Sequence, residues 1–90
     1  MKTEFRDSFV DKLNRQVLYI SEDKPSAARK FKNDLLDKIK KLIDQPYKNR
    51  RSIYFENDQI RDLTFKGYTI VYKVDKLKNI ISVFAMIKYE

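Results

Sequence analysis

The spacing of the apolar residues changes once along this chain, at Pro46, and that change limits the folds open to it. Before Pro46 the apolar residues recur every three or four positions, which is the period of one helix face. The two stripes are Val10, Leu13, Val17 and Ile20, then Ala28, Phe31, Leu35, Ile39 and Leu42. They predict helices over residues 8–21 and 25–44, with Pro25 in the first turn of the second. The short polar break between them predicts an antiparallel helical hairpin.

After Pro46 the apolar residues alternate, which is the period of a β-strand. The pattern predicts strands over residues 60–66, 68–75 and 80–88, with Gly67 in a turn or bulge between the first two. Residues 2–6 are expected to form a short edge strand, and residues 52–56 a short extended piece. The predicted fold is α+β, in the order β-α-α-β-β-β, with the helical hairpin packed on an antiparallel sheet. The chain is expected to be a single domain over residues 1–90.

The two faces of the predicted sheet differ in what covers them. Tyr68, Ile70, Tyr72 and Val74 share the face expected to pack on the helices. The opposite face carries Val71 and whichever residues of the last strand lie beside it. The candidates are Ile81, Val83, Ala85 and Ile87. An apolar face without a cover favours a protein partner, and the alternative is that the loop 45–59 folds over it.

The composition excludes several classes of site. The sequence has no Cys and no His, so disulfides, thiolate metal sites and imidazole chemistry are excluded. With a single glycine, Gly67, it cannot build a glycine-rich phosphate loop, and we expect no cofactor and no metal. No apolar run approaches the ~20 residues of a membrane span, and no apolar signal region follows the N-terminus. We therefore expect a soluble cytoplasmic protein that does not associate with a membrane.

The positive charge is concentrated in one part of the chain. The net charge is +7, and residues 24–51 hold ten basic and three acidic residues, which accounts for all of it. A field of this kind favours a polyanion or an acidic protein as partner. The alternative is a solvated helix face followed by a basic loop.

Two segments of the sequence resemble a known family. The first runs from Tyr19 to Phe31 and includes Pro25-Ser26-Ala27-Ala28. The second joins Ile60-Arg61-Asp62-Leu63 to Gly67-Tyr68-Thr69-Ile70-Val71-Tyr72-Lys73-Val74. Both resemble the RelE/ParE superfamily of toxins from type II toxin–antitoxin (plasmid stabilisation) systems, and the helix opening is closer to the ParE-like branch. The resemblance implies a small basic toxin that is neutralised by an acidic antitoxin whose disordered tail folds on its surface.

The resemblance also implies one of two modes of action. RelE-like toxins are ribosome-dependent mRNA endonucleases, whereas ParE-like toxins inhibit DNA gyrase by binding. The nuclease branch has Arg directly after the Gly-Tyr pair, where this chain has Thr69. This difference favours a ParE-like toxin that binds its target and has no catalytic centre. The residues expected to contact partners are Arg50, Arg51, Val71, Lys73, Val83, Ala85 and Ile87.

Two other hypotheses remain open at the level of sequence. A RelE-like ribonuclease without His would depend on Lys, Arg, Tyr or a carboxylate for proton transfer and charge stabilisation. The candidates are Arg61, Lys66, Lys73, Lys88 and Tyr89, although Arg61 is as well suited to an ion pair with Asp62 or Glu56. A nucleic-acid-binding module would use the basic block over residues 24–51, but this block lacks the interleaved aromatic residues of single-strand binders. A toxin that has lost its activity fits the same sequence.

Overall fold

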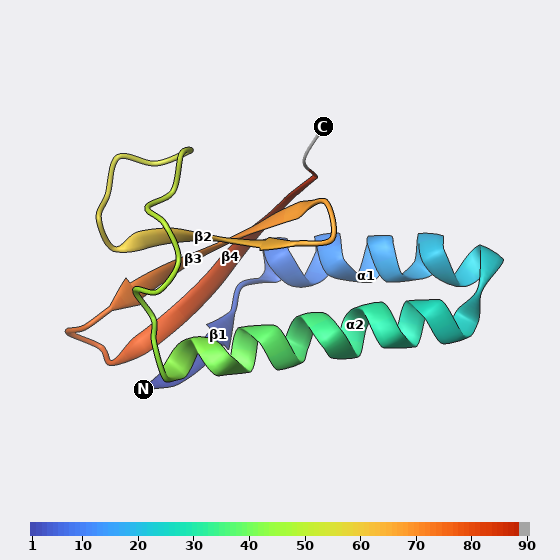
Figure 1. Ribbon diagram of the computed structural model, residues 1–90, viewed down its shortest axis with the longest axis horizontal. Coiled ribbons are helices and arrows are strands. Elements are labelled where there is room, and N and C mark those ends of the chain that lie inside the picture. The colour runs from blue at the N-terminus through green and yellow to red at the C-terminus, as the bar shows by residue number, and fades with distance from the viewer. Residues whose placement is uncertain (89–90) are drawn as a thin grey trace.

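A computed structural model describes residues 1–88 and confirms the predicted order of elements (Figure 1). The strands are β1 (Lys2–Phe5), β2 (Ile60–Phe65), β3 (Tyr68–Asp75) and β4 (Ile80–Lys88). The helices are α1 (Asp7–Asp23), α2 (Pro25–Lys40) and the 3₁₀ turn η1 (Lys41–Ile43). Pro25 occupies the first turn of α2, and an extended Lys24 separates α2 from α1. The chain is therefore an α+β domain with two helices packed on a four-stranded sheet.

The sheet is mixed rather than wholly antiparallel, and this corrects the sequence prediction. The strand order is β1-β4-β3-β2, with β2, β3 and β4 forming an antiparallel meander. β1 joins the outer edge of β4 in parallel, with Phe5 opposite Val83. The meander strands are joined by short turns, which force them to alternate in direction. No turn joins β1 to β4, so the alternating pattern does not fix their relative direction.

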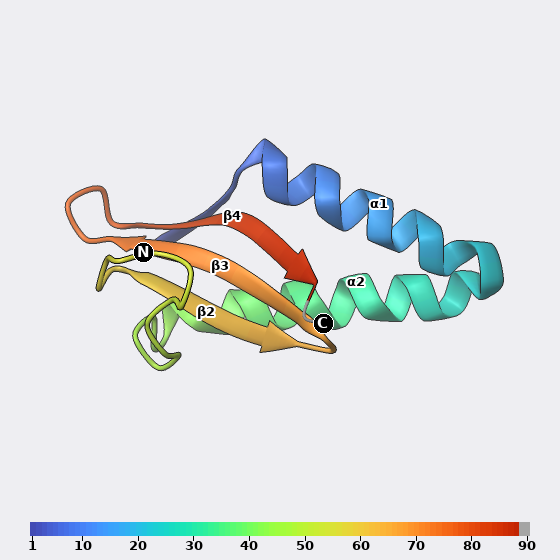
Figure 2. The ribbon, with the colours of Figure 1, turned by 90° about the horizontal axis from the view of Figure 1, so that it is seen from above.

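The two helices cover one face of the sheet and extend beyond its end (Figures 1 and 2). Phe31, Leu35 and Ile39 of α2 belong to one core cluster with Leu13 of α1 and with Ile70 and Tyr72 of β3. Val10 and Val17 pack against this cluster and are partly buried. The predicted helical stripes are therefore the ones that meet the sheet.

Two local features of the meander decide which side chains share a face. Lys66 and Gly67 both have positive φ, at 43° and 82°, which is typical of a type I′ hairpin turn, so β2 ends at Phe65 rather than at residue 66. A bulge then shifts the register between β3 and β4, so that Val71 faces Ala85 while Tyr72 faces Val83. Val83 therefore lies on the helix-covered face, fully buried, and its predicted place on the opposite face is wrong.

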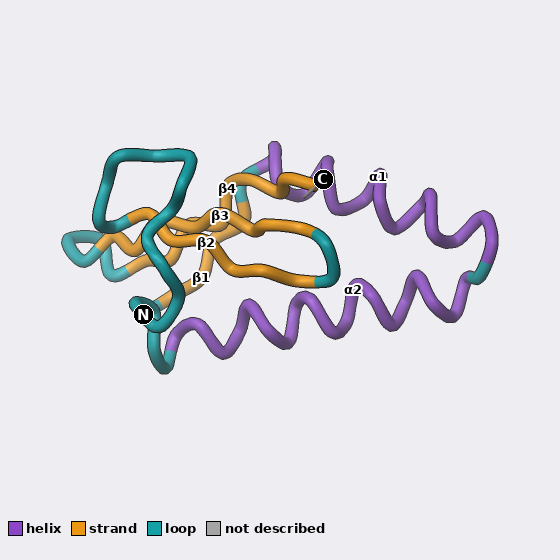
Figure 3. Tube along the Cα trace, turned by 45° about the horizontal axis from the view of Figure 1, so that its top comes forward, coloured by secondary structure: helices purple, strands orange, loops and turns teal. Residues whose placement is uncertain are grey.

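The long loop over residues 44–59 covers part of the opposite face, which we call the outer face (Figure 3). The backbone N–H of Ser52 donates to Ile60, and the N–H of Asp62 donates to Arg50, so the loop pairs briefly with the edge of β2. This pairing is a single bridge at Arg51, shorter than the extended piece expected over residues 52–56. Val71 is fully buried in the chain, so the prediction that it is exposed to a partner is wrong. Within residues 1–88, none of the helices has the length and apolar character needed to cross a membrane.

Candidate partner-binding surface

Tyr72 anchors the loop 44–59 to the sheet. Its hydroxyl donates to the backbone oxygen of Pro46 at 2.7 Å and accepts from the side-chain amide of Asn49 at 3.1 Å. The ring belongs to the hydrophobic core and is fully buried. Burial raises the pKa of the Tyr72 hydroxyl above its ordinary value, while the hydrogen bond from Asn49 opposes that rise. A core side chain therefore also fixes the start of the loop.

Arg61 holds the same loop from β2. Its Nε donates to the backbone oxygen of Asp58 at 2.9 Å, and one terminal nitrogen donates to that of Asn49 at 3.2 Å. The guanidinium lies 4.9 Å from the ring centroid of Tyr47, a cation–π distance. The expected ion pair with Asp62 or Glu56 is thus replaced by hydrogen bonds to carbonyl groups. Arg61 has a structural role in this arrangement.

Of the other candidate cations of a ribonuclease, Lys73 lies apart from Lys66 and Lys88. Lys66 is in the β2–β3 turn, and Lys88 is opposite Tyr68 at the same end of the meander. Lys73 lies five residues beyond Tyr68 along β3, roughly 17 Å away at the rise of an antiparallel strand. Tyr72 pairs with Arg61, so these two side chains share a face of the sheet. Lys73 is the next residue of the strand, so its side chain points to the opposite face from that of Arg61. Tyr89 lies outside the described residues.

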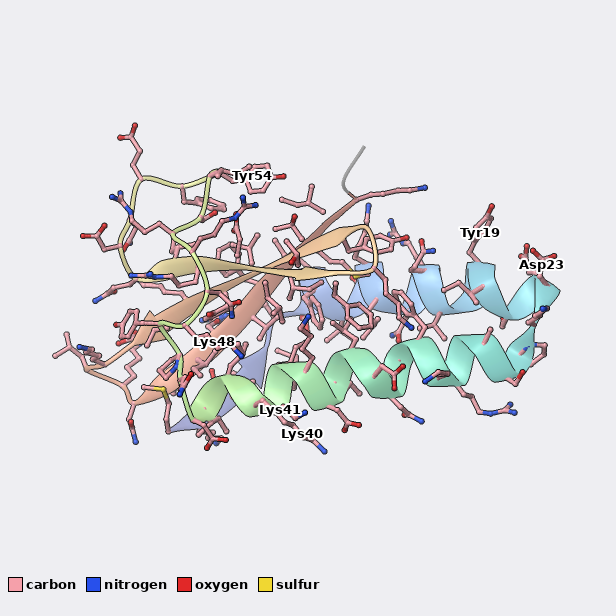
Figure 4. The ribbon with its side chains drawn as sticks, in the orientation of Figure 1. Tyr19, Asp23, Lys40, Lys41, Lys48 and Tyr54 are labelled. Carbon is pink, nitrogen blue, oxygen red and sulfur yellow. The ribbon has the colours of Figure 1, made fainter. Side chains whose placement is uncertain are left out.

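An outer apolar surface extends from the loop onto β4. Phe55 packs edge-to-face on Phe84 at 5.4 Å between ring centroids, and it remains 41% exposed. Ile53 and Tyr54 are 63% and 43% exposed on the same loop, and Figure 4 shows Tyr54 on the side of the sheet away from α2. The half-buried Ala85 and Ile87 lie opposite Val71 and Thr69. We define this outer apolar surface as Ile53, Tyr54, Phe55, Phe84, Ala85 and Ile87.

Sequence reasoning found only the strand residues of this surface. Ala85 and Ile87 were predicted from the alternation of β4, whereas Ile53, Tyr54, Phe55 and Phe84 were missed. The signal for the loop residues was present, because three consecutive apolar residues interrupt an otherwise polar loop. Phe84 was missed because the bulge places it on the outer side, and a bulge leaves no mark in the alternating pattern.

The loop itself carries two arginines close to its apolar residues. Arg51 pairs with Asp58 at 2.8 Å, and Arg50 lies 3.7 Å from the buried carboxylate of Asp62. The Asp62 carboxylate also accepts a hydrogen bond from the backbone N–H of Ile53 at 3.1 Å. Lys73 lines a hollow with Glu4, Arg6 and Phe84, at the end of the sheet far from the β2–β3 turn. The predicted residues Arg50 and Arg51 are therefore beside the loop part of the outer apolar surface, and Lys73 is beside Phe84 at one end of the sheet.

The rest of the basic block follows α2. Arg29, Lys32 and Lys40 are exposed on the helix, and Figure 4 shows Lys40, Lys41 and Lys48 at the C-terminal end of α2 and on the following loop. Asp34 interrupts the positive charge, because it pairs with Lys30 at 3.0 Å and with Lys66 at 3.6 Å. Lys30 lowers the pKa of Asp34, chiefly through their hydrogen bond. Within residues 1–88 no cluster of three or more carboxylates could hold a metal ion.

Comparisons with known proteins place this geometry in a family. Residues 3–88 match the family model described as the ParE toxin of the type II toxin–antitoxin system parDE. No curated protein matches the chain significantly. Eight solved chains match, and one is from a chromosomal ParDE toxin–antitoxin system of P. aeruginosa. It has a TM-score of 0.76 and 18% identity, over 100% of this chain and 97% of that one.

A second solved structure has the same fold. It is a double mutant of the E. coli toxin RelE in complex with a peptide of the antitoxin RelBc. The TM-score is 0.58 and the identity 18%, over 98% of this chain and 82% of that one. The two likenesses establish the fold, and the family model, which covers nearly the whole length, establishes the family. The chain belongs to the ParE toxin family of type II toxin–antitoxin systems.

Proposed function

We propose that this type II toxin inhibits its cellular target by binding it, and that the target is DNA gyrase. The observation that carries the proposal is the dispersal of the cations that a nuclease would need. Arg61 is engaged with the loop, Lys73 is near the opposite end of β3 from Lys66 and Lys88, and Thr69 replaces an arginine. Loss of one transition-state hydrogen-bond donor costs an enzyme about 2.7–4 kcal/mol in activation free energy, so losing several leaves little cleavage.

We further propose that an acidic antitoxin neutralises the toxin in the cytoplasm. The outer apolar surface and the neighbouring Arg50 and Arg51 suit an acidic segment that folds on binding, with its apolar side chains against Phe55 and Phe84. The E. coli RelE structure, solved with an antitoxin peptide, supports a partner of this kind for the fold. Lys73, Ala85 and Ile87 remain proposed contacts. Val71 and Val83 are buried, so they do not belong to the proposed surface.

Supercoiling of relaxed plasmid by purified gyrase tests the proposed mode of action. We expect the wild-type chain to inhibit supercoiling in a dose-dependent manner. The Phe55→Ser/Phe84→Ser variant should retain that inhibition while it loses rescue by a co-expressed antitoxin, since the proposal assigns those residues to the antitoxin. The matched control is Leu18→Ser/Leu77→Ser, which changes exposed apolar residues outside the outer apolar surface. Undiminished supercoiling at a large excess of folded toxin would refute gyrase as the target.

A further inference from the structure

A cavity of about 570 Å³ opens beside the β2–β3 turn, next to the outer apolar surface, since Thr69 in its lining lies opposite Ile87. Its lining comes from α2, the loop and both strands of the hairpin. The residues are Lys38, Arg50, Thr64, Phe65, Lys66, Gly67, Tyr68 and Thr69. No acidic side chain is among them, although Asp34 and Asp62 are within reach of Lys66 and Arg50 from outside the lining. The electrostatic character of the cavity is therefore positive.

The three cations of the cavity are held loosely by the chain itself. Lys66 Nζ is 3.6 Å from Asp34, and the nearest Arg50 nitrogen is 3.7 Å from Asp62. Both distances exceed the 2.7–2.9 Å typical of a charge-assisted hydrogen bond. Both side chains are 51% exposed. Lys38 Nζ donates to the backbone oxygen of Thr64 at 3.1 Å, and Lys38 and Lys66 also lie over the Phe65 ring, at 6.0 and 5.4 Å from its centroid. An incoming anion can therefore recruit all three without breaking a close ion pair.

A buried hydroxyl in the lining lacks a partner. Thr69 is 1% exposed, and within the described residues its Oγ1 has no hydrogen-bond partner. Leaving a buried polar group unpaired costs about 1–3 kcal/mol, so native structures rarely keep one without a reason. A ligand oxygen that enters the cavity would provide the missing partner.

The backbone of β2 contributes a further element of recognition. In β2, Ile60 and Asp62 direct their backbone groups away from β3, because they bond to Ser52 and Arg50 of the loop. Thr64 lies two residues beyond Asp62, so its backbone N–H and C=O also point away from β3, and its C=O accepts a hydrogen bond from Lys38. Beyond the bridge at Arg51, no described segment pairs with this edge. The Thr64 N–H is thus left for an added strand, directly beside the cationic cavity.

We propose that this cavity binds a carboxylate of an acidic peptide segment that runs along the outer edge of β2. The carboxylate lies among Lys38, Arg50 and Lys66, and the peptide backbone accepts a hydrogen bond from the Thr64 N–H. The open edge favours a peptide over a nucleic acid, since a strand is its complement. The aromatic rings in the lining, Phe65 and Tyr68, are buried and offer no stacking platform for bases. The inference rests on the proposed acidic antitoxin and adds a second contact to it.

Titration of the ¹⁵N-labelled full chain, followed by amide chemical shifts, tests this site. The probe is an end-blocked hexapeptide of alternating glutamate and valine, and the control peptide has glutamine in place of glutamate. We expect the glutamate peptide to shift the amides of Thr64, Gly67 and Thr69, and the glutamine peptide to leave them in place. In the Lys38→Gln/Lys66→Asn variant the Kd for the glutamate peptide should rise about tenfold or more, because one or two charge-assisted hydrogen bonds are lost.

The variants are chosen to keep the fold. Asn tolerates the positive φ of residue 66, and Lys38 is exposed, so unfolding midpoints should match the wild type. Lys32→Gln/Lys40→Gln removes the same charge from the exposed face of α2 outside the cavity, and it should leave the Kd within about twofold. Equal weakening by this control, equal binding of the glutamine peptide, or shifts confined to other residues would overturn the proposal. So would tighter binding of a single-stranded oligonucleotide at the same amides.

The two proposals fail in different ways. If Lys38→Gln/Lys66→Asn is neutralised by the antitoxin as well as the wild type is, the cavity is not an antitoxin contact, while inhibition by binding stands. If gyrase is not inhibited but the peptide binds as described, the carboxylate site stands and the proposed target is wrong.

Discussion

Tyr72 combines two roles that are usually separate, because its ring is in the core while its hydroxyl holds the backbone of the loop. The alternation of β3 predicts the buried ring. The hydroxyl contacts come from Pro46 and Asn49, more than twenty residues earlier in the chain, and no local pattern predicts them. A buried tyrosine hydroxyl needs a partner, however, so its burial alone indicates a polar segment nearby.

Tyr72→Phe should loosen the loop while leaving the core intact. The substitution removes the hydrogen bonds with Pro46 and Asn49, at a cost of about 1–3 kcal/mol in the free energy of unfolding. Urea unfolding measures this cost, and faster amide exchange over residues 46–52 would locate it. Tyr54→Phe removes an exposed hydroxyl and serves as the control, with an expected change within ±0.5 kcal/mol. Equal stability of Tyr72→Phe and wild type would contradict the anchoring role.

The same residue links stability to alkaline pH. Burial raises the pKa of Tyr72 above its ordinary value of 10.0, so above about pH 10 the unfolded chain loses this proton more readily than the folded one. The folded state then binds more protons than the unfolded state, and the free energy of unfolding falls as pH rises. Burial raises the pKa of Tyr68 as well. Well below pH 10 the free energy of unfolding should not depend on this group. Between about pH 10 and 11.5 it should fall less steeply with pH in Tyr72→Phe than in the wild type. Identical slopes would contradict the assignment.

At the scale of elements, the sequence predicts what depends on local periodicity. The hairpin of α1 and α2, the three strands of the meander and the turn at Gly67 all follow from spacing, and all are confirmed within a few residues. The parallel pairing of β1, the bulge beside Tyr72 and the pairing of the loop with the edge of β2 are not local. Each depends on contacts between segments far apart in the chain, so each lies beyond what a period can indicate.

The packing of the hairpin on the sheet gives a direct stability prediction. Leu35 is fully buried in the cluster that joins α2 to β3, so Leu35→Ala should lower the free energy of unfolding by about 2–5 kcal/mol. Chemical denaturation of the isolated chain gives this value, and Leu18→Ala, at an exposed position on α1, should change it by less than about 0.5 kcal/mol. A midpoint unchanged by Leu35→Ala would mean that this stripe does not face the sheet.

The candidate site was only partly predictable from the sequence, because part of it depends on how distant segments of the chain meet. Arg50 and Arg51 follow from the charge distribution, and Ala85 and Ile87 follow from alternation. Whether a residue on the outer face is exposed depends on where the loop lies, and the loop has no periodic pattern. Val71 was therefore predicted on the surface although it is fully buried, while Ile53 and Phe55 were not predicted although they are exposed on the loop.

At the scale of the whole molecule, the sheet separates two regions of different character. The helices and the core lie on one side, with the exposed cations of α2 facing solvent. The outer apolar surface lies on the other side, and the cationic cavity opens at the edge of β2, where α2, the loop and the β2–β3 turn meet. A net charge of +7 favours the approach of acidic partners, and exposed apolar side chains can then make short-range contacts.

The central claim is that this toxin acts by binding and not by cleaving RNA. Primer extension on a message translated in the presence of the purified chain tests it most directly. We predict no new codon-phased stops at toxin concentrations that inhibit gyrase, because Arg61 is engaged with the loop and Lys73 lies far from Lys66 and Lys88. Codon-phased cuts in the wild type that disappear in folded Arg61→Ala or Lys88→Ala would contradict the account and establish a ribonuclease.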